Sequence, residues 1–162
     1  MIRFAAALPL VLSLAAPAFA ADLIATHRIS AGLANEAVGA AVAACAKQGY
    51  AETAVLVDAD GVTQASLRGD NAGIHTFDSA HDKAYTSVTF KSDTGTLVER
   101  AKTAPIATLT SKLPHLLLFQ GGLVIKAGDE VVGAIGASGA PGGNLDEACA
   151  KAGLDAIHER LK

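Results

Sequence analysis

The sequence of 162 residues contains no tryptophan and one methionine, and aromatic side chains make up 4% of it. Few large aromatic side chains are therefore available for a core, and the helix predicted at 30–47 is built mostly of alanine, which buries little area but allows close packing. The chain also lacks a basic excess, with 13 basic against 16 acidic residues. This balance argues against nucleic-acid binding, which depends on clustered lysine and arginine.

Several compact chemical motifs are also missing. Without H-E-x-x-H or Cys-x-x-Cys, the sequence gives little support for a zincin or a structural zinc site. The glycines at 133, 136 and 139 lack the G-K-[ST] and parallel βαβ context of nucleotide-binding loops. Ser138 lacks the Gly-x-Ser-x-Gly spacing of a hydrolase nucleophile. These absences favour a binding protein over an enzyme, since no activated nucleophile or acid–base pair can be named.

The first 20 residues have the features of a secretory signal peptide. Arg3 gives a positive start, an almost wholly apolar run follows, and Ala18-Phe19-Ala20 provides an A-x-A cleavage site. A membrane anchor is the alternative, but prolines and a serine interrupt the apolar run. We expect cleavage after Ala20 and a periplasmic or secreted protein in which residues 21–162 form one domain.

Apolar periodicity and turn residues predict the order of the elements. Ser30 is a suitable N-cap for a helix to about Lys47, and Ala59-Asp60-Gly61 separates two strand-like runs as a hairpin turn. The predicted elements are helices at 30–47, from Thr76 or Asp78 to about Phe90, at 94–101 and from Asn144 onward, and strands at 53–58, 62–68, 122–126 and 130–137. Pro105 and Pro114 predict an irregular segment. This order predicts an α+β domain with an antiparallel sheet flanked by helices.

The last predicted helix begins with a capping-box pattern. Asn144 can accept from amides of the first turn, and Glu147 stands three residues later, where it can reach back. The helix start would then present amides suited to an anion.

The two cysteines lie on apolar helix faces. Cys45 shares its stripe with Val38 and Ala41, and Cys149 shares one with Leu145 and Ala152. Export would bring both into an oxidising compartment, so a disulfide forms if the first and last helices are neighbours. Two small buried thiols are the alternative, which the sequence slightly favours because it does not give the Cα separation.

An ordered set of short motifs resembles a known family. The final third runs from a strand through a Gly-x-Ser-Gly turn to an acidic helix start and the Cys-Ala-x-Ala-Gly-Leu run at 149–154. Upstream, the motifs at 60–61, 68–70, 83–86 with Phe90, and 121–122 occur in the family's order. Over roughly residues 30–162 the chain resembles the GlcG/HbpS-like heme-binding proteins. The resemblance implies a profilin-like fold whose N- and C-terminal helices pack together, which would place both cysteines on adjacent elements, and a homo-oligomer.

Histidines provide the candidate iron ligands, because imidazole is the usual protein ligand of heme iron. His81 is the best-placed candidate, since it lies inside a predicted helix and shares a face with Tyr85 and Val88. His75 is the second candidate, because it follows an accessible loop. The alternative for both is an ordinary surface histidine. The remaining histidines are His27, His115 and His158.

Three further residues complete the predicted heme site. Tyr85 is a candidate phenolate ligand, although packing as a core aromatic is favoured. Lys83 and Arg68 are candidate partners for the heme propionates, because carboxylates need cationic or amide partners. For Arg68 the alternative is an ordinary surface ion pair.

The leading functional hypothesis is an exported protein that binds heme or a related tetrapyrrole. The resemblance also links the family to redox sensing with a membrane sensor partner, and a corrinoid is the alternative flat ligand. A second hypothesis is a small-carboxylate binding protein or accessory enzyme, of the glycolate type, in which helix amides with Arg68 or Lys83 hold the anion. A third is an oligomeric interaction module, which is compatible with the first.

Overall fold

The structure, a computed structural model, describes residues 23–162. The predicted signal peptide at 1–20 lies outside these residues, and its cleavage stays a prediction. Within the described part of the chain, no helix has both the length and the apolar character needed to cross a membrane.

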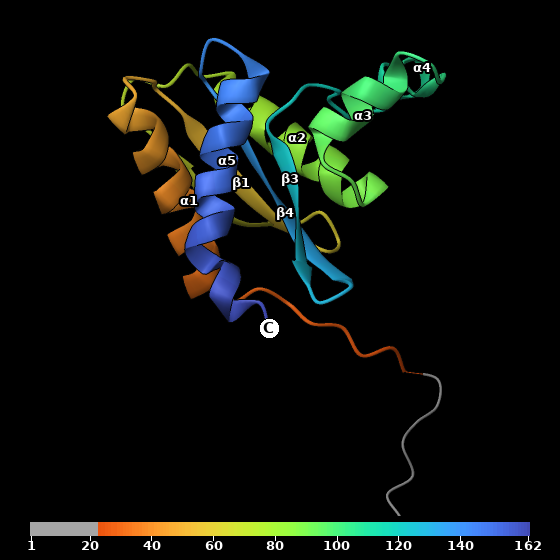
Figure 1. Ribbon diagram of the computed structural model, residues 1–162, viewed down its shortest axis with the longest axis horizontal. Coiled ribbons are helices and arrows are strands. Elements are labelled where there is room, and N and C mark those ends of the chain that lie inside the picture. Colours follow the sequence, from red (N-terminus) through yellow and green to blue (C-terminus); the bar gives the residue numbers. More distant parts are fainter. Residues whose placement is uncertain (1–22) are drawn as a thin grey trace, which may run out of the picture.

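A four-stranded antiparallel sheet in the order β2-β1-β4-β3 forms the centre of the fold (Figure 1). Its strands are β1 (Thr53–Asp58), β2 (Thr63–Arg68), β3 (Gly122–Ala127) and β4 (Glu130–Ser138). Both predicted hairpins are confirmed, and they join through pairing of β1 with β4, in which Thr53 lies opposite Ser138. Every residue of β1 is buried, because β1 is central and both of its faces are covered.

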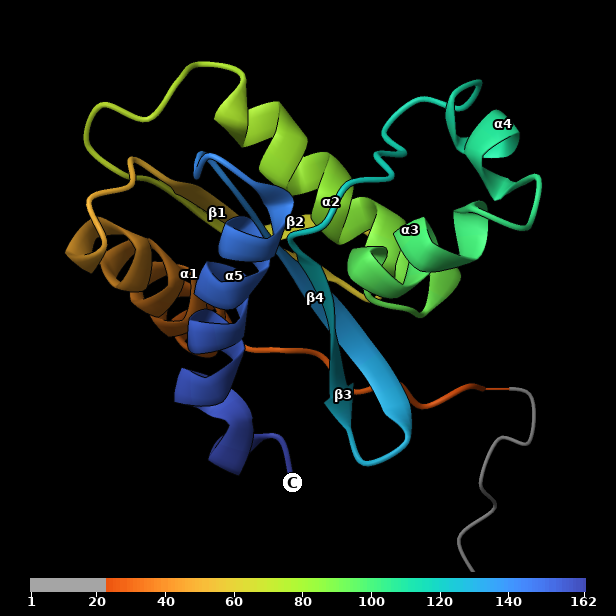
Figure 2. The ribbon, with the colours of Figure 1, turned by 45° about the horizontal axis from the view of Figure 1, so that its top comes forward.

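Helices cover both faces of the sheet (Figure 2). The first face carries α1 (Ala31–Lys47) and α5 (Gly143–Ile157), which pack against each other, and the 3₁₀ turn His158–Arg160 follows α5. The second face carries α2 (Thr76–Phe90), with α3 (Thr94–Ala101) beside its end. The predicted profilin-like α+β fold with packed terminal helices is confirmed. The segment predicted as irregular contains a short helix, α4 (Ile106–Thr110), which begins directly after Pro105, a residue that helix starts tolerate.

Alternation along β1 divides the core into two clusters. Ala54 and Leu56 face α1 and α5, whereas Val55 and Val57 face α2. Small residues dominate both clusters, so the helices approach the sheet closely. As predicted, Ser30 caps α1, with its Oγ accepting from the amide of Leu33 at 3.3 Å.

A disulfide joins Cys45 of α1 to Cys149 of α5. Their Cα atoms are 5.5 Å apart, and both side chains are fully buried. The alternative of two free thiols, which the sequence slightly favoured, is therefore wrong. The deciding quantity was the Cα separation, which only the packing of the two helices supplies.

Gly153 lies where α5 packs tightly against α1. A Cβ at this position would lie 2.5 Å from the carbonyl oxygen of Ala37 and 2.9 Å from the side chain of Ile135. Gly39, which lies inside α1, is the matched contrast, because a Cβ there would have no neighbour within 4 Å. Both glycines therefore have ordinary helical backbone conformations, and they differ only in how closely other atoms pack around them.

Gly153→Ala should lower the free energy of unfolding by about 1–3 kcal/mol, because overpacking outweighs the gain in helix propensity. Gly39→Ala should raise it by up to about 1 kcal/mol, because only the propensity gain applies there. Urea denaturation of both variants measures the difference. Equal effects from the two substitutions would contradict the close approach at Gly153.

Candidate functional site

Helix α2 presents two different flanks. Residues four apart along it, His75, Ser79 and Lys83, lie beside the end of β4. His81 and Tyr85 share another flank, where their rings stack with centroids 5.9 Å apart. The two histidines predicted as iron ligands therefore do not meet, and each belongs to a separate candidate site.

A cavity of about 400 Å³ lies between the start of α2, the end of β4 and the start of α5. Its lining includes His75, Thr76, Ser79, Lys83, Phe119 and Ser138. His75 is exposed at the beginning of α2, and Phe119 is 49% exposed. The cavity thus combines an accessible imidazole and an aromatic ring with a polar floor.

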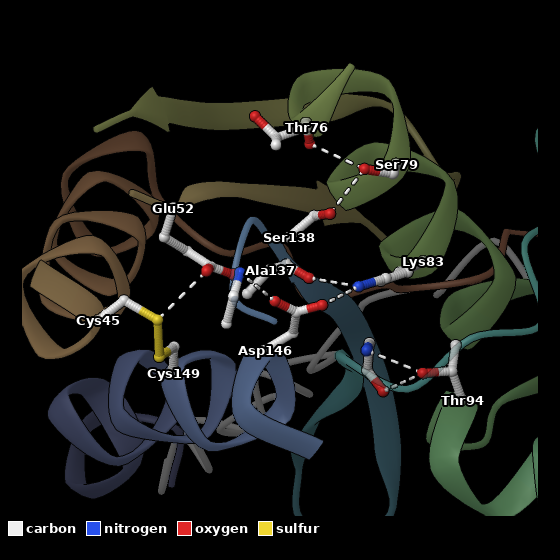
Figure 3. Close-up of polar contacts among 12 residues, drawn as sticks. Cys45, Glu52, Thr76, Ser79, Lys83, Thr94, Ala137, Ser138, Asp146 and Cys149 are labelled. Carbon is white, nitrogen blue, oxygen red and sulfur yellow. Dashed lines mark hydrogen bonds and ion pairs between the residues drawn. A yellow bond between two sulfur atoms is a disulfide. The ribbon is translucent and has the colours of Figure 1, made fainter. Parts of the chain in front are cut away.

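A buried ion pair forms part of this floor (Figure 3). Lys83 Nζ donates to Asp146 Oδ2 at 2.5 Å and to the carbonyl oxygen of Ala137 at 2.9 Å. Both side chains are almost fully buried, and Nζ lies 5.1 Å from the centroid of the Phe119 ring. The pair connects α2 to α5 through the end of β4.

The predicted capping box at the start of α5 is wrong. Gly142 is the N-cap, in an extended conformation without a side-chain cap, and Asn144 already lies in the first turn. Asp146 stabilises the β4–α5 turn instead, because its Oδ1 accepts from the amide of Ala140 at 2.9 Å. Glu147 points inward with a buried Oε2, and burial raises the pKa of its carboxyl group. The sequence pattern failed because α5 begins at Gly143, so Asn144 lies inside the first turn and not at the N-cap.

Glu52 is a buried acid next to this ion pair. Burial raises its pKa to about 8, the nearby Asp146 carboxylate adds to the increase, and Lys83 opposes it. Glu52 Oε2 lies 3.2 Å from the Sγ of Cys45. A disulfide sulfur carries no proton, so Cys45 cannot donate to this carboxyl group. Nothing in the sequence around Glu52 signals this role.

The hydroxyl groups of Thr76, Ser79 and Ser138 also line the cavity. Ser79 Oγ donates to Ser138 Oγ at 2.7 Å, which links α2 to β4 (Figure 3). The hydroxyls of Thr53 and Thr76 lie 2.6 Å apart, and that of Thr76 donates to the carbonyl oxygen of Gly73. Small polar ligands could exchange hydrogen bonds with these hydroxyl groups.

Arg68 lies outside the cavity. Its Nε donates to the carbonyl oxygen of Ala72 at 2.8 Å, a bond that holds the loop before His75. Arg68 lines a separate hollow with Tyr50 and Glu52. Pairing of Arg68 and Lys83 with propionates stays a prediction, and both cations already have protein partners.

The second flank of α2 gathers three rings. His115, from the loop before β3, meets His81 and Tyr85 edge-on, with centroids 5.8 and 6.1 Å away. Tyr85 also packs over the β1–β2 turn, where a Cβ on Gly61 would lie 2.8 Å from its ring. Its role as a phenolate ligand stays a prediction. The sequence did not predict the approach of His115, which lies 34 residues beyond His81.

Comparison with known proteins identifies the family. A family model described as "Haem degrading protein HbpS-like" matches residues 29–155. The chain belongs to the HbpS-like family. A crystal structure of a double mutant of Streptomyces reticuli HbpS is similar to it, with 36% sequence identity, a TM-score of 0.80, and coverage of 92% of this chain and 99% of that one. The resemblance stated from the sequence is confirmed.

More distant structures share the fold. Klebsiella pneumoniae protein ORFY has 21% identity and a TM-score of 0.78, with 87% of this chain and 98% of that chain covered. PduOC, crystallised as a heme complex, has 22% identity and a TM-score of 0.72, with 81% and 96% covered. A search of curated proteins finds no match.

The raised pKa of Glu52 predicts how stability depends on pH. Between about pH 4.5 and 8 the folded protein keeps a proton that the unfolded chain has released, so this group lowers stability as pH rises. Glu52→Gln should flatten that decline in the free energy of unfolding, measured by urea denaturation from pH 5 to 8. Glu99→Gln, at an exposed glutamate, is the control and should keep the wild-type slope. An unchanged slope in Glu52→Gln would contradict a protonated Glu52.

Proposed function

We propose that this protein binds heme or a related tetrapyrrole after export, in the cavity at the start of α2. Membership of a family described as haem-degrading supports a heme-related function. PduOC, which shares the fold, was crystallised with heme. The observation that carries the proposal for this chain is the exposed His75 at the mouth of a cavity that also contains Phe119.

The residues at the cavity fit the chemistry of a tetrapyrrole. The imidazole of His75 is a suitable axial ligand for iron. Ile74 is 86% exposed, and Phe77 and Phe119 are 40% and 49% exposed, so apolar surface is available for the part of a macrocycle that the cavity does not enclose. The rival ligand is His81 beside Tyr85 on the other flank of α2.

Export is part of the proposal. The disulfide between Cys45 and Cys149 is the kind of bond that persists in oxidising compartments, which supports a periplasmic or secreted location. Redox sensing with a membrane partner and homo-oligomerisation belong to the same hypothesis.

A small carboxylate is the second candidate ligand. The hydroxyls of Thr76, Ser79 and Ser138 and the ammonium of Lys83 make the inner cavity polar. Such groups hydrogen-bond a compact anion better than the face of a macrocycle. This arrangement favours a glycolate-type acid bound inside the cavity.

Hemin titration of mature protein should give a saturable Soret shift, because His75 supplies an iron ligand. His75→Ala should change the Soret spectrum and weaken binding at least about tenfold, whereas His81→Ala should leave both unchanged. The reverse pattern would move the site to the His81 flank, and unchanged spectra in both variants would contradict histidine ligation.

Native mass spectrometry with heme, cobalamin and glycolate separates the ligand classes and counts subunits. Retention of heme by the wild-type protein supports the proposal. Retention of glycolate alone supports the small-carboxylate candidate. Retention of cobalamin alone would replace heme with a corrinoid.

A further inference from the structure

Two imidazoles and a carboxylate converge on the flank of α2 away from the cavity. His81 Nδ1 lies 3.0 Å from Asp82 Oδ1, and His115 Nδ1 lies 3.4 Å from the same oxygen. The ligand atoms of all three residues lie within 4.8 Å of one another. Two of these residues come from α2 and the third comes from the loop before β3, so tertiary packing brings them together.

These separations match those of ligands around a first-row transition metal. Bonds of about 2.1 Å at angles between about 90° and 109° separate neighbouring ligand atoms by about 3.0–3.4 Å. Both distances to Asp82 Oδ1 fall in this interval. The third pair needs only a small side-chain adjustment, because it already lies within 4.8 Å.

The protein fixes the two elements that carry the ligands. Thr86 Oγ1 donates to the carbonyl oxygen of Asp82 at 2.7 Å and accepts from the amide of Leu117 at 2.8 Å. This hydroxyl therefore ties the His115 loop to α2 within one turn of Asp82. His115 itself has a φ of 62°, a backbone conformation that costs energy for a histidine and persists only where its surroundings impose it.

Exposure of the cluster suits an ion that enters from solvent. The side chains of His81 and Asp82 are 20% and 26% exposed, whereas that of His115 is 63% exposed. His81 and Asp82 are thus largely covered by the surrounding protein, whereas the side chain of His115 is free to adjust toward an ion that enters from solvent.

We propose that His81, Asp82 and His115 form a binding site for a divalent first-row transition metal ion of the Zn²⁺ type. Two neutral imidazoles and one carboxylate are ligands that Zn²⁺ and Co²⁺ accept, whereas Ca²⁺ and Mg²⁺ prefer all-oxygen sites. Three protein ligands leave at least one coordination position for water or a small ligand. The site is separate from the cavity at His75 and does not depend on heme binding there.

Co²⁺ added to the mature protein should produce visible absorption bands that saturate at one ion per chain, and Zn²⁺ should displace it. Asp82→Asn and His115→Asn should each weaken Co²⁺ binding at least about tenfold, because each removes a ligand. Asparagine suits position 115, since it tolerates a positive φ. His158→Ala, at an exposed histidine distant in sequence, is the control and should bind normally.

Circular dichroism and thermal melts would establish that the variants fold. Absence of saturable binding, or binding that neither Asp82→Asn nor His115→Asn weakens, would overturn the site and leave the cluster as imidazole–carboxylate hydrogen bonds. Hemin titration of His115→Asn separates the two proposals. It should match that of the wild-type protein if the His75 cavity holds the tetrapyrrole, whatever the outcome with Co²⁺.

Discussion

The buried ion pair between Lys83 and Asp146 is the constraint on which the rest of the structure depends. It joins α2 on one face of the sheet to α5 on the other, at the end of β4. A buried charge without its partner is very costly, so the two helices must hold their relative positions. The same Asp146 fixes the β4–α5 turn through the amide of Ala140 and helps to keep Glu52 protonated. The floor of the cavity, the β4–α5 turn and the surroundings of the disulfide are therefore connected through Asp146.

The same constraint positions α2, which contributes residues to both candidate sites. Lys83 fixes the helix, and His75 and Ser79, which precede Lys83 by two turns and one turn, line the cavity with it. The other flank directs His81 and Asp82 toward His115. A single helix therefore lines two chemically different candidate sites, the partly apolar cavity proposed to bind a tetrapyrrole and the nitrogen-rich cluster proposed to bind a metal ion. The HbpS-like family supports the first of these functions, and the geometry of this chain suggests the second.

Local patterns in the sequence predicted the elements well, because caps, turns and periodicity act over a few residues. The Ser30 cap and both hairpins are examples. The packing of the terminal helices was instead implied by the family resemblance. Contacts between distant residues could not be predicted in this way. Lys83 and Asp146 are 63 residues apart, and the cysteines are 104 apart. The mistaken cap at Asn144 has a local cause, because α5 begins at Gly143, before the predicted N-cap.

A double-mutant cycle on Lys83 and Asp146 tests this account most directly. Lys83→Met and Asp146→Asn remove one charge each with little change in volume, and their free energies of unfolding can be measured by urea denaturation. Each single substitution should cost about 3–5 kcal/mol, because it leaves an unpaired buried charge. The double substitution should cost clearly less than the sum of the two. Additive costs, or single costs below about 1 kcal/mol, would contradict a structure organised around this pair.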